Sequence, residues 1–134
     1  MNHVLDACAM IAFLRGERGD DVVARLIADP SHTCHAHAIN LCEVFYDFLR
    51  ASDLTTAQAA LGDLQRVGVR AQRSMSRPFW QRAGQLKGTI RRISLADCFA
   101  ITLAETLKAP VVTSDHHEFD PLAAAGVCQV IFIR

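Results

Sequence analysis

The chain has 134 residues, of which 51% are hydrophobic and 21% charged, and its 14 basic residues balance its 14 acidic ones. This length suits one domain with a substantial hydrophobic core, and the composition excludes an intrinsically disordered chain. The longest purely apolar run, Ala7 to Leu14, is far below the roughly 20 residues that span a bilayer. The start MNHVLDA lacks the basic residues of a signal peptide, and the five cysteines form no disulfide framework, so we expect a reduced cytoplasmic protein.

The first half of the chain alternates short apolar stretches with helical patterns. The predicted elements, in order, are a strand at His3–Leu5, helices at Ala7–Arg15 and Asp20–Ala28, a strand at Thr33–His37 and a helix from Asn40 to about Ala51. Asp6 follows the first strand, and Gly16 ends the first helix. Asn40 is the predicted N-cap of the third helix, because Glu43 follows it at the capping-box spacing.

The second half continues this alternation. The predicted elements are helices from about Thr55 to Gly68 and at Pro78–Leu86, a connection at Thr89–Arg92, a helix at Leu95–Ala104, a strand at Val111–Thr113, a helix at Asp120–Gly126 and a strand at Val127–Ile133. Ser94 is the predicted N-cap of the Leu95 helix, which is apolar on nearly every side and therefore buried. Asp120-Pro121 predicts another helix start, with proline at the first helical position.

Strands that alternate with helices indicate an α/β fold with a mainly parallel sheet. Four acids stand at corresponding places: Asp6 and Asp115 follow strands, and Glu43 and Asp97 lie near the starts of apolar helices. All four could converge at the carboxyl edge of the sheet, where α/β proteins bind ligands. Two carboxylates about 4 Å apart repel by roughly 4 kcal/mol at an effective dielectric near 20, so such a cluster needs a cation.

Magnesium and manganese are the natural cations for this cluster, because they prefer carboxylate oxygens. Such a centre can activate water and stabilise charge on a phosphoryl group. Taken singly, Glu43 and Asp97 are better explained as capping residues, and Asp6 as a turn residue. Their joint occurrence favours the metal site.

A basic segment between Gln65 and Ala96 suits a polyanionic substrate such as RNA. It contains eight basic residues and no acid: Arg66, Arg70, Arg73, Arg77, Arg82, Lys87, Arg91 and Arg92. Arginines bind phosphates well, although a basic helix face can also be merely solvated. We take Arg73, Arg77, Arg82, Arg91 and Arg92 as candidate RNA contacts. Phe79 and Trp80 could stack on bases, but we interpret both as core residues.

The order and spacing of these motifs resemble the PIN-domain family of metal-dependent ribonucleases. The matching stretches are Val4-Leu5-Asp6, Leu41-Cys42-Glu43-Val44, Ser94-Leu95-Ala96-Asp97 and Thr113-Ser114-Asp115, followed by Glu118-Phe119. At this length the chain is most similar to the VapC-like toxins of toxin–antitoxin pairs. The resemblance implies one PIN-like nuclease domain over residues 1–134, folded as a three-layer α/β/α sandwich.

The resemblance also implies a function. Asp6, Glu43, Asp97 and Asp115 would be catalytic and would bind Mg²⁺ or Mn²⁺, with Ser94 and Thr113 in support. The substrate would be tRNA, rRNA or mRNA, and the partners a cognate antitoxin and a second copy in a homodimer, without a membrane. One departure is that Asp6 is followed by Ala7 and Cys8, where the family usually carries Ser or Thr.

The sequence also admits interpretations other than a metal-dependent ribonuclease. A catalytically silent PIN-like domain could bind RNA or a protein through the same surfaces. A receiver domain would need an acidic pair after the first strand, where Asp6 stands alone. Cys34, His35 and His37 suggest zinc, but strand alternation puts Cys34 on the opposite face. Cys8, Cys42 and Cys98 neighbour the acids, as small packing residues or as a thiol site, and His116-His117 are predicted in a surface loop.

Overall fold

The structure, a computed structural model, describes every residue from Met1 to Arg134. The elements in chain order are β1 (Asn2–Leu5), α1 (Ala7–Arg15), α2 (Asp20–Ala28), β2 (Thr33–His37), α3 (Ala38–Ala51), α4 (Leu54–Arg66), β3 (Arg70–Gln72), α5 (Arg77–Thr89), α6 (Leu95–Leu107), β4 (Val111–Thr113), α7 (His116–Ala124) and β5 (Val130–Phe132). None of the helices combines the length and apolar character needed to cross a membrane.

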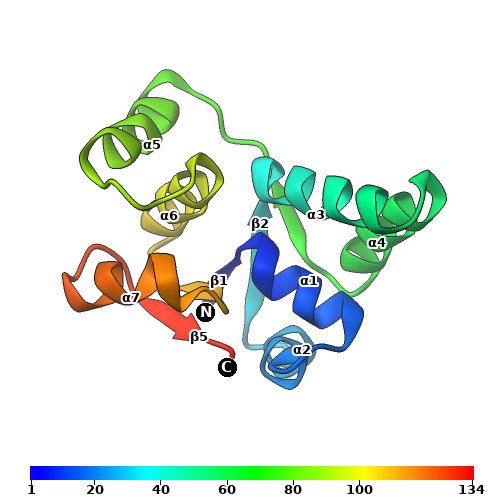
Figure 1. The fold of residues 1–134 in the computed structure, drawn as a ribbon. Coiled ribbons are helices and arrows are strands. Elements are labelled where there is room, and N and C mark those ends of the chain that lie inside the picture. The colour runs from blue at the N-terminus through cyan, green and yellow to red at the C-terminus, as the bar shows by residue number, and fades with distance from the viewer.

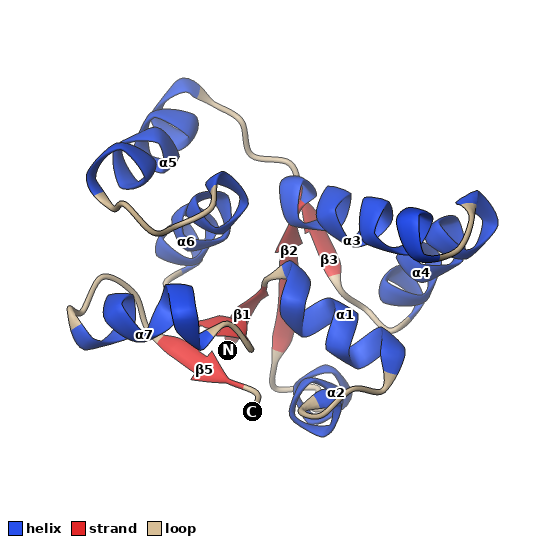
Figure 2. Ribbon diagram, viewed as in Figure 1, coloured by secondary structure: helices blue, strands red, loops and turns tan.

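The five strands form one parallel sheet in the order β3-β2-β1-β4-β5. From the central strand β1 the chain builds outward through β2 to β3, and then returns to the other side of β1 for β4 and β5. Because parallel crossovers are right-handed, this reversal puts α1–α4 on one face and α5–α7 on the other (Figure 1, Figure 2). The predicted three-layer α/β/α sandwich is therefore confirmed.

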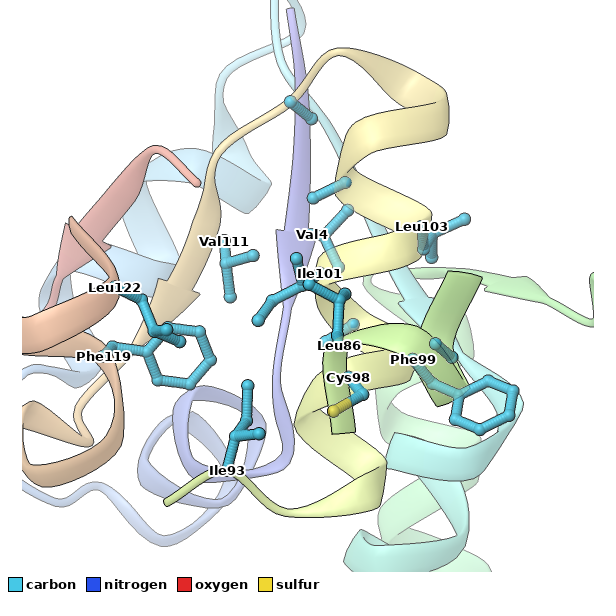
Figure 3. Packing of buried hydrophobic residues seen from close by; sticks show 14 of the residues in the cluster. Val4, Leu86, Ile93, Cys98, Phe99, Ile101, Leu103, Val111, Phe119 and Leu122 are labelled. Carbon is cyan, nitrogen blue, oxygen red and sulfur yellow. The ribbon is translucent and has the colours of Figure 1, made fainter. Parts of the chain in front are cut away.

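Each face of the sheet packs against its own hydrophobic core. Val4 and Val111 face α5–α7, where their cluster includes Phe79, Leu86, Phe99, Ile101, Phe119 and Leu122 (Figure 3). Leu5 and Val112 face α1–α4, where their cluster includes Met10, Val23, Val44 and Leu64. Adjacent residues of β1 and β4 thus enter different cores, which is why these strands are apolar without alternation.

The ends of several helices are fixed as the sequence predicts. Gly16 ends α1 in the left-handed conformation, with φ of 64°, which glycine adopts without steric cost. The Ser94 side chain accepts a hydrogen bond from the Asp97 N–H, so Ser94 is the N-cap of α6. Residues Asp97–Ala104 of α6 are buried, as its apolar sequence predicts. That helix extends to Leu107 and ends at Lys108, before Ala109-Pro110.

Three predicted features of the fold are wrong. Helix α3 begins at Ala38, because the His37 ring accepts from the Ile39 N–H and caps it; Asn40 therefore lies inside the helix. Strand β3 was not predicted, because it is a three-residue edge strand with polar residues. Helix α7 begins at His116, since Asp115 caps it, and Pro121 lies within the helix rather than at its start.

Candidate active site

The carboxyl ends of β1 and β4 and the starts of α1, α3, α6 and α7 define one edge of the sheet. Asp6 follows β1 and is the N-cap of α1, while Asp115 follows β4 and is the N-cap of α7. Asp97 lies in the first turn of α6. Glu43 lies in the second turn of α3, one turn later than predicted, because that helix starts at Ala38.

Three carboxylates come closest together at this edge. Oxygens of Asp97, Asp115 and Glu118 all lie within 4.8 Å of one another. Asp115 Oδ1 accepts a hydrogen bond of 3.0 Å from the Glu118 N–H, and Glu118 Oε2 accepts one of 3.3 Å from the Ser94 N–H. Ser94 Oγ in turn accepts from the Asp97 N–H at 3.1 Å. Ser94 thus connects the acid of α6 to the acid of α7.

Asp6 is the deepest of the acids, with 1% of its surface exposed. Its Oδ1 accepts a 2.9 Å hydrogen bond from the Ala9 N–H, whereas its buried Oδ2 has no partner. Burial raises the pKa of Asp6 to about 7; the charges of Glu43 and Asp115 add to this rise, and the Thr113 hydroxyl and Ala9 N–H oppose it. Thr113 is itself buried, and its Oγ1 accepts from the Asp115 N–H at 3.0 Å.

The pKa values of Asp97 and Glu43 are raised, like that of Asp6. Burial, followed by a hydrogen bond with Glu118 and by the charges of Asp6 and Glu118, raises the pKa of Asp97 to about 9. Burial and then the Glu118 charge raise the pKa of Glu43. These mutual effects mean that the four predicted acids and Glu118 share one electrostatic environment, which penalises several negative charges at once.

Glu118 is absent from the set of site residues predicted from the sequence. Asp115 and Glu118 stand at the capping-box spacing, which marks a helix start at Asp115. Asp120-Pro121 predicts a later helix start, which leaves Glu118 outside the predicted helix. The correct helix start turns the Glu118 side chain toward Ser94 and Asp97.

The basic candidates divide into two groups. Arg73, Arg77, Arg91 and Arg92 are exposed and make no ion pair. Arg82 instead donates to both carboxylate oxygens of Glu105 in α6, at 2.9 and 2.7 Å. Arg82, a candidate RNA contact in the sequence, is therefore paired with an acid from outside the basic segment, because the fold brings α6 beside α5.

The aromatic, cysteine and histidine interpretations have mixed outcomes. Phe79 is buried as predicted, but Trp80 is 45% exposed, so its assignment to the core is wrong. Cys98 is buried, whereas Cys8 and Cys42 are exposed and do not fill the core.

Hydrogen bonds within the protein engage both ring nitrogens of two histidines of β2. His35 bonds Asn2 and Gln72, while His37 bonds the Ile39 N–H and the Ser74 carbonyl. His116 and His117 lie in the first turn of α7 rather than in a loop, because α7 starts earlier than predicted.

A comparison with protein families finds one match: the family model described as PIN domain matches residues 3–124. A comparison with curated proteins finds no match. Several solved structures share the fold over nearly the whole chain. VapBC2 from Rickettsia felis, bound to a DNA fragment from its promoter, is 17% identical, with 98% of each chain covered and a TM-score of 0.72.

Two further solved structures have similar sequence identities, coverages and TM-scores. DNA-bound VapBC from Salmonella typhimurium is 14% identical, with 100% of this chain and 99% of that chain covered and a TM-score of 0.75. VapC20 from Mycobacterium tuberculosis, a sarcin–ricin loop cleaving toxin, is 17% identical, with coverages of 92% and 95% and a TM-score of 0.71. At these identities the likeness is one of fold.

Proposed function

The chain belongs to the PIN domain family, and we propose that it is a metal-dependent endoribonuclease that hydrolyses RNA phosphodiester bonds. We further propose that it is the VapC-like toxin of a toxin–antitoxin pair and that residues 1–134 form one nuclease domain. The observation that carries the proposal is the cluster of Asp97, Asp115 and Glu118 at the carboxyl edge of the sheet. The charges of Asp115 and Glu118 also raise the pKa values of the nearby acids Asp6 and Glu43.

The donor atoms at this edge fit a hard divalent cation. The buried Asp6 Oδ2 has no partner, and burial and neighbouring charges raise the pKa values of Asp6, Asp97 and Glu43. A cation relieves both penalties, and Mg²⁺ or Mn²⁺ prefers carboxylate oxygens. We assign it to Asp6, Glu43, Asp97, Asp115 and Glu118. When bound, it supplies an activated water and stabilises negative charge on a phosphoryl group.

The protein's own groups have separate roles in this proposal. Ser94 and Thr113 hold the carboxylates in place, since Ser94 bonds to the backbone of Asp97 and to Glu118, and Thr113 bonds to the backbone of Asp115. Glu43 is less buried than Asp6 or Asp97, and its pKa is raised. A raised pKa makes Glu43 a stronger proton acceptor than an ordinary carboxylate, which suits a general base toward water.

The exposed arginines are proposed to bind the substrate. Arg91 and Arg92 immediately precede Ile93 and Ser94, so they stand at the rim of the acidic site. Arg73 and Arg77 lie between the end of β3 and the start of α5, at the same edge of the sheet. Arginine binds phosphate through paired hydrogen bonds. We assign Arg82 to the contact between α5 and α6, because Glu105 occupies its guanidinium.

The structural relatives support an antitoxin partner and an RNA substrate, whereas the homodimer and the location come from the family resemblance of the sequence. The Rickettsia and Salmonella relatives are VapBC complexes, and VapC20 cleaves the sarcin–ricin loop. We propose a cognate antitoxin, a homodimer and a cytoplasmic location, with a structured RNA such as this loop as the substrate.

Cleavage of a mixed pool of tRNA and rRNA tests the function. We expect cutting with Mg²⁺ or Mn²⁺ that stops with chelator and is reduced at least a hundredfold in Asp97→Asn. Asp63→Asn, an exposed acid on α4 away from the cluster, is the matched control and retains activity. RNA binding without cutting by the native chain would support a silent binding domain instead.

A further inference from the structure

Asn40 is a buried amide whose presence the packing does not explain. It is 0% exposed and lies in the first turn of α3. Its Oδ1 is buried without a hydrogen-bond partner. A buried polar atom without a partner destabilises the fold, so an apolar side chain of the same shape would be more stable here. The presence of Asn40 must therefore be explained by what its Nδ2 group donates to.

The Asn40 Nδ2 donates to the carbonyl oxygen of Ala96 at 3.3 Å, across 56 positions of sequence. Ala96 lies in the first turn of α6, directly before Asp97. Glu43 lies three residues after Asn40, so the two share a face of α3. This bond therefore connects the turn that precedes Glu43 to the turn that carries Asp97.

The two helices need such a connection. Val44 of α3 and the buried hydrophobic residues of α6 belong to different cores, on opposite faces of the sheet (Figure 1). Of the hydrophobic residues of α3, only the partly buried Ile39 packs against the core that includes α6. The Asn40–Ala96 bond is the one side-chain hydrogen bond between α3 and α6. The His37 ring, which caps α3, also packs on Phe99 of α6, with centroids 5.1 Å apart.

We propose that Asn40 is a positioning residue, which holds Glu43 of α3 and Asp97 of α6 at the separation that a divalent cation requires. The inference rests on the proposed function, because it assigns a role toward the metal of that site. Asn40 acts through the backbone of Ala96 and is not itself a ligand. Partners that orient metal ligands in this way typically change metal affinity by about 10–100-fold when they are removed.

Mn²⁺ titration of the metal-free protein, by calorimetry well below the unfolding midpoint, tests the proposal. Asn40→Leu keeps the shape of the side chain but removes the donor and the unpaired oxygen. We expect its Mn²⁺ affinity to fall about tenfold or more, while its thermal midpoint without metal stays equal to that of the native chain or rises. For RNA cleavage we expect kcat to fall and KM to be unchanged. Asn40→Ala is the second variant if the leucine does not fold.

Asn2→Ala is the matched control. The Asn2 Oδ1 bonds the His35 ring at 3.0 Å, also between two elements, but at the start of β1, on the opposite edge of the sheet. We expect it to lower stability and leave Mn²⁺ affinity unchanged. If the native chain binds Mn²⁺ and Asn40→Leu binds it equally, or if Asn2→Ala weakens binding as much, the positioning role is overturned and the proposed function stands. If the native chain binds no Mn²⁺, both are overturned.

Discussion

Asp6 and Asp97 are acidic side chains in buried positions, where a negative charge is unfavourable. Asp6 is 1% exposed and Asp97 9% exposed, and each has other carboxylates as neighbours. Without a cation, protonation of these carboxyl groups removes the repulsion. Their pKa values are therefore raised, to about 7 for Asp6 and about 9 for Asp97. The stability of the metal-free protein should therefore depend on pH in an unusual direction.

We predict that the free energy of unfolding of the metal-free protein decreases as the pH rises from about 5 to 9. The unfolded chain loses these protons near the ordinary pKa of 3.8, whereas the native state keeps them up to about 7 and 9. Where the native state binds more protons, raising the pH favours unfolding. Urea unfolding at pH 5 and pH 8 measures the effect. Asp97→Asn should be more stable than the native chain at pH 8, and a stability that rises over this range would contradict the prediction.

A second residue-scale prediction concerns Glu118. Because its oxygen lies within 4.8 Å of those of Asp97 and Asp115, Glu118→Gln should lower Mn²⁺ affinity. We expect at least a tenfold loss, in line with the removal of one charged ligand from a hard-cation site. Glu17→Gln, in the loop after α1, is the control, since the Glu17 carboxylate forms an ion pair with Arg134 and is outside the acidic cluster. Equal affinities of the native chain and Glu118→Gln, measured by calorimetry, would remove Glu118 from the site.

At the scale of secondary-structure elements, the N-termini of helices bring the site residues together. The acids of α6 and α7 meet through Ser94, which caps α6 and also donates its N–H to Glu118. Ser94→Ala should lower the free energy of unfolding by about 1 kcal/mol, because the Asp97 N–H loses its acceptor. It should also reduce nuclease activity, because Asp97 is then less firmly held.

The chain offers a matched control for this cap. Ser76 is the N-cap of α5, but its side chain makes no capping hydrogen bond. Ser76→Ala should therefore leave both stability and activity unchanged. Similar losses in the two variants, by chemical denaturation, would show that the capping bond of Ser94 is not the cause.

Most elements follow from the sequence, and the errors have local causes. The ranges Ala7–Arg15, Asp20–Ala28, Thr33–His37 and Val111–Thr113 agree with the structure residue by residue. The capping preference predicts Asn40 as the N-cap of α3, yet His37, a weaker capping residue in general, is the N-cap in the structure. No local pattern marks β3, because its three residues, Arg70, Ala71 and Gln72, are too few to show alternation and include only one small apolar residue.

The candidate site was predictable only in part. Asp6, Asp97 and Asp115 stand at strand ends and helix starts, which parallel topology brings to one edge. The bonds of Glu118 to Ser94 and of Asn40 to Ala96 cross 24 and 56 residues of sequence and are not predicted. The same holds for Arg82, whose partner Glu105 lies 23 residues away. Long-range pairs of this kind leave no trace in local spacing. The local signal for Glu118 is its capping-box spacing from Asp115, which marks the start of α7.

At the scale of the whole molecule, the charge is divided between an acidic edge and exposed arginines, although the net charge is zero. We predict that Arg91→Ala with Arg92→Ala weakens RNA binding and reduces its salt dependence, because two phosphate contacts and their counterions are lost. Arg82→Ala should leave that salt dependence unchanged, since the charge of Arg82 is already paired with Glu105. Filter binding of tRNA at several salt concentrations compares the two. An equal change of slope in both would contradict the assignment.

The most direct test of the metal centre is to count the protons released when Mn²⁺ binds at pH 7.5. In the metal-free protein Asp97, with a pKa of about 9, holds its proton at this pH, and Asp6, with a pKa of about 7, holds it in part. Cations bind the deprotonated carboxylates. Calorimetric titrations in two buffers of different ionisation enthalpy should therefore show release of about one proton per protein. Binding without proton release, or no binding at all, would contradict the view that these buried acids are the metal site.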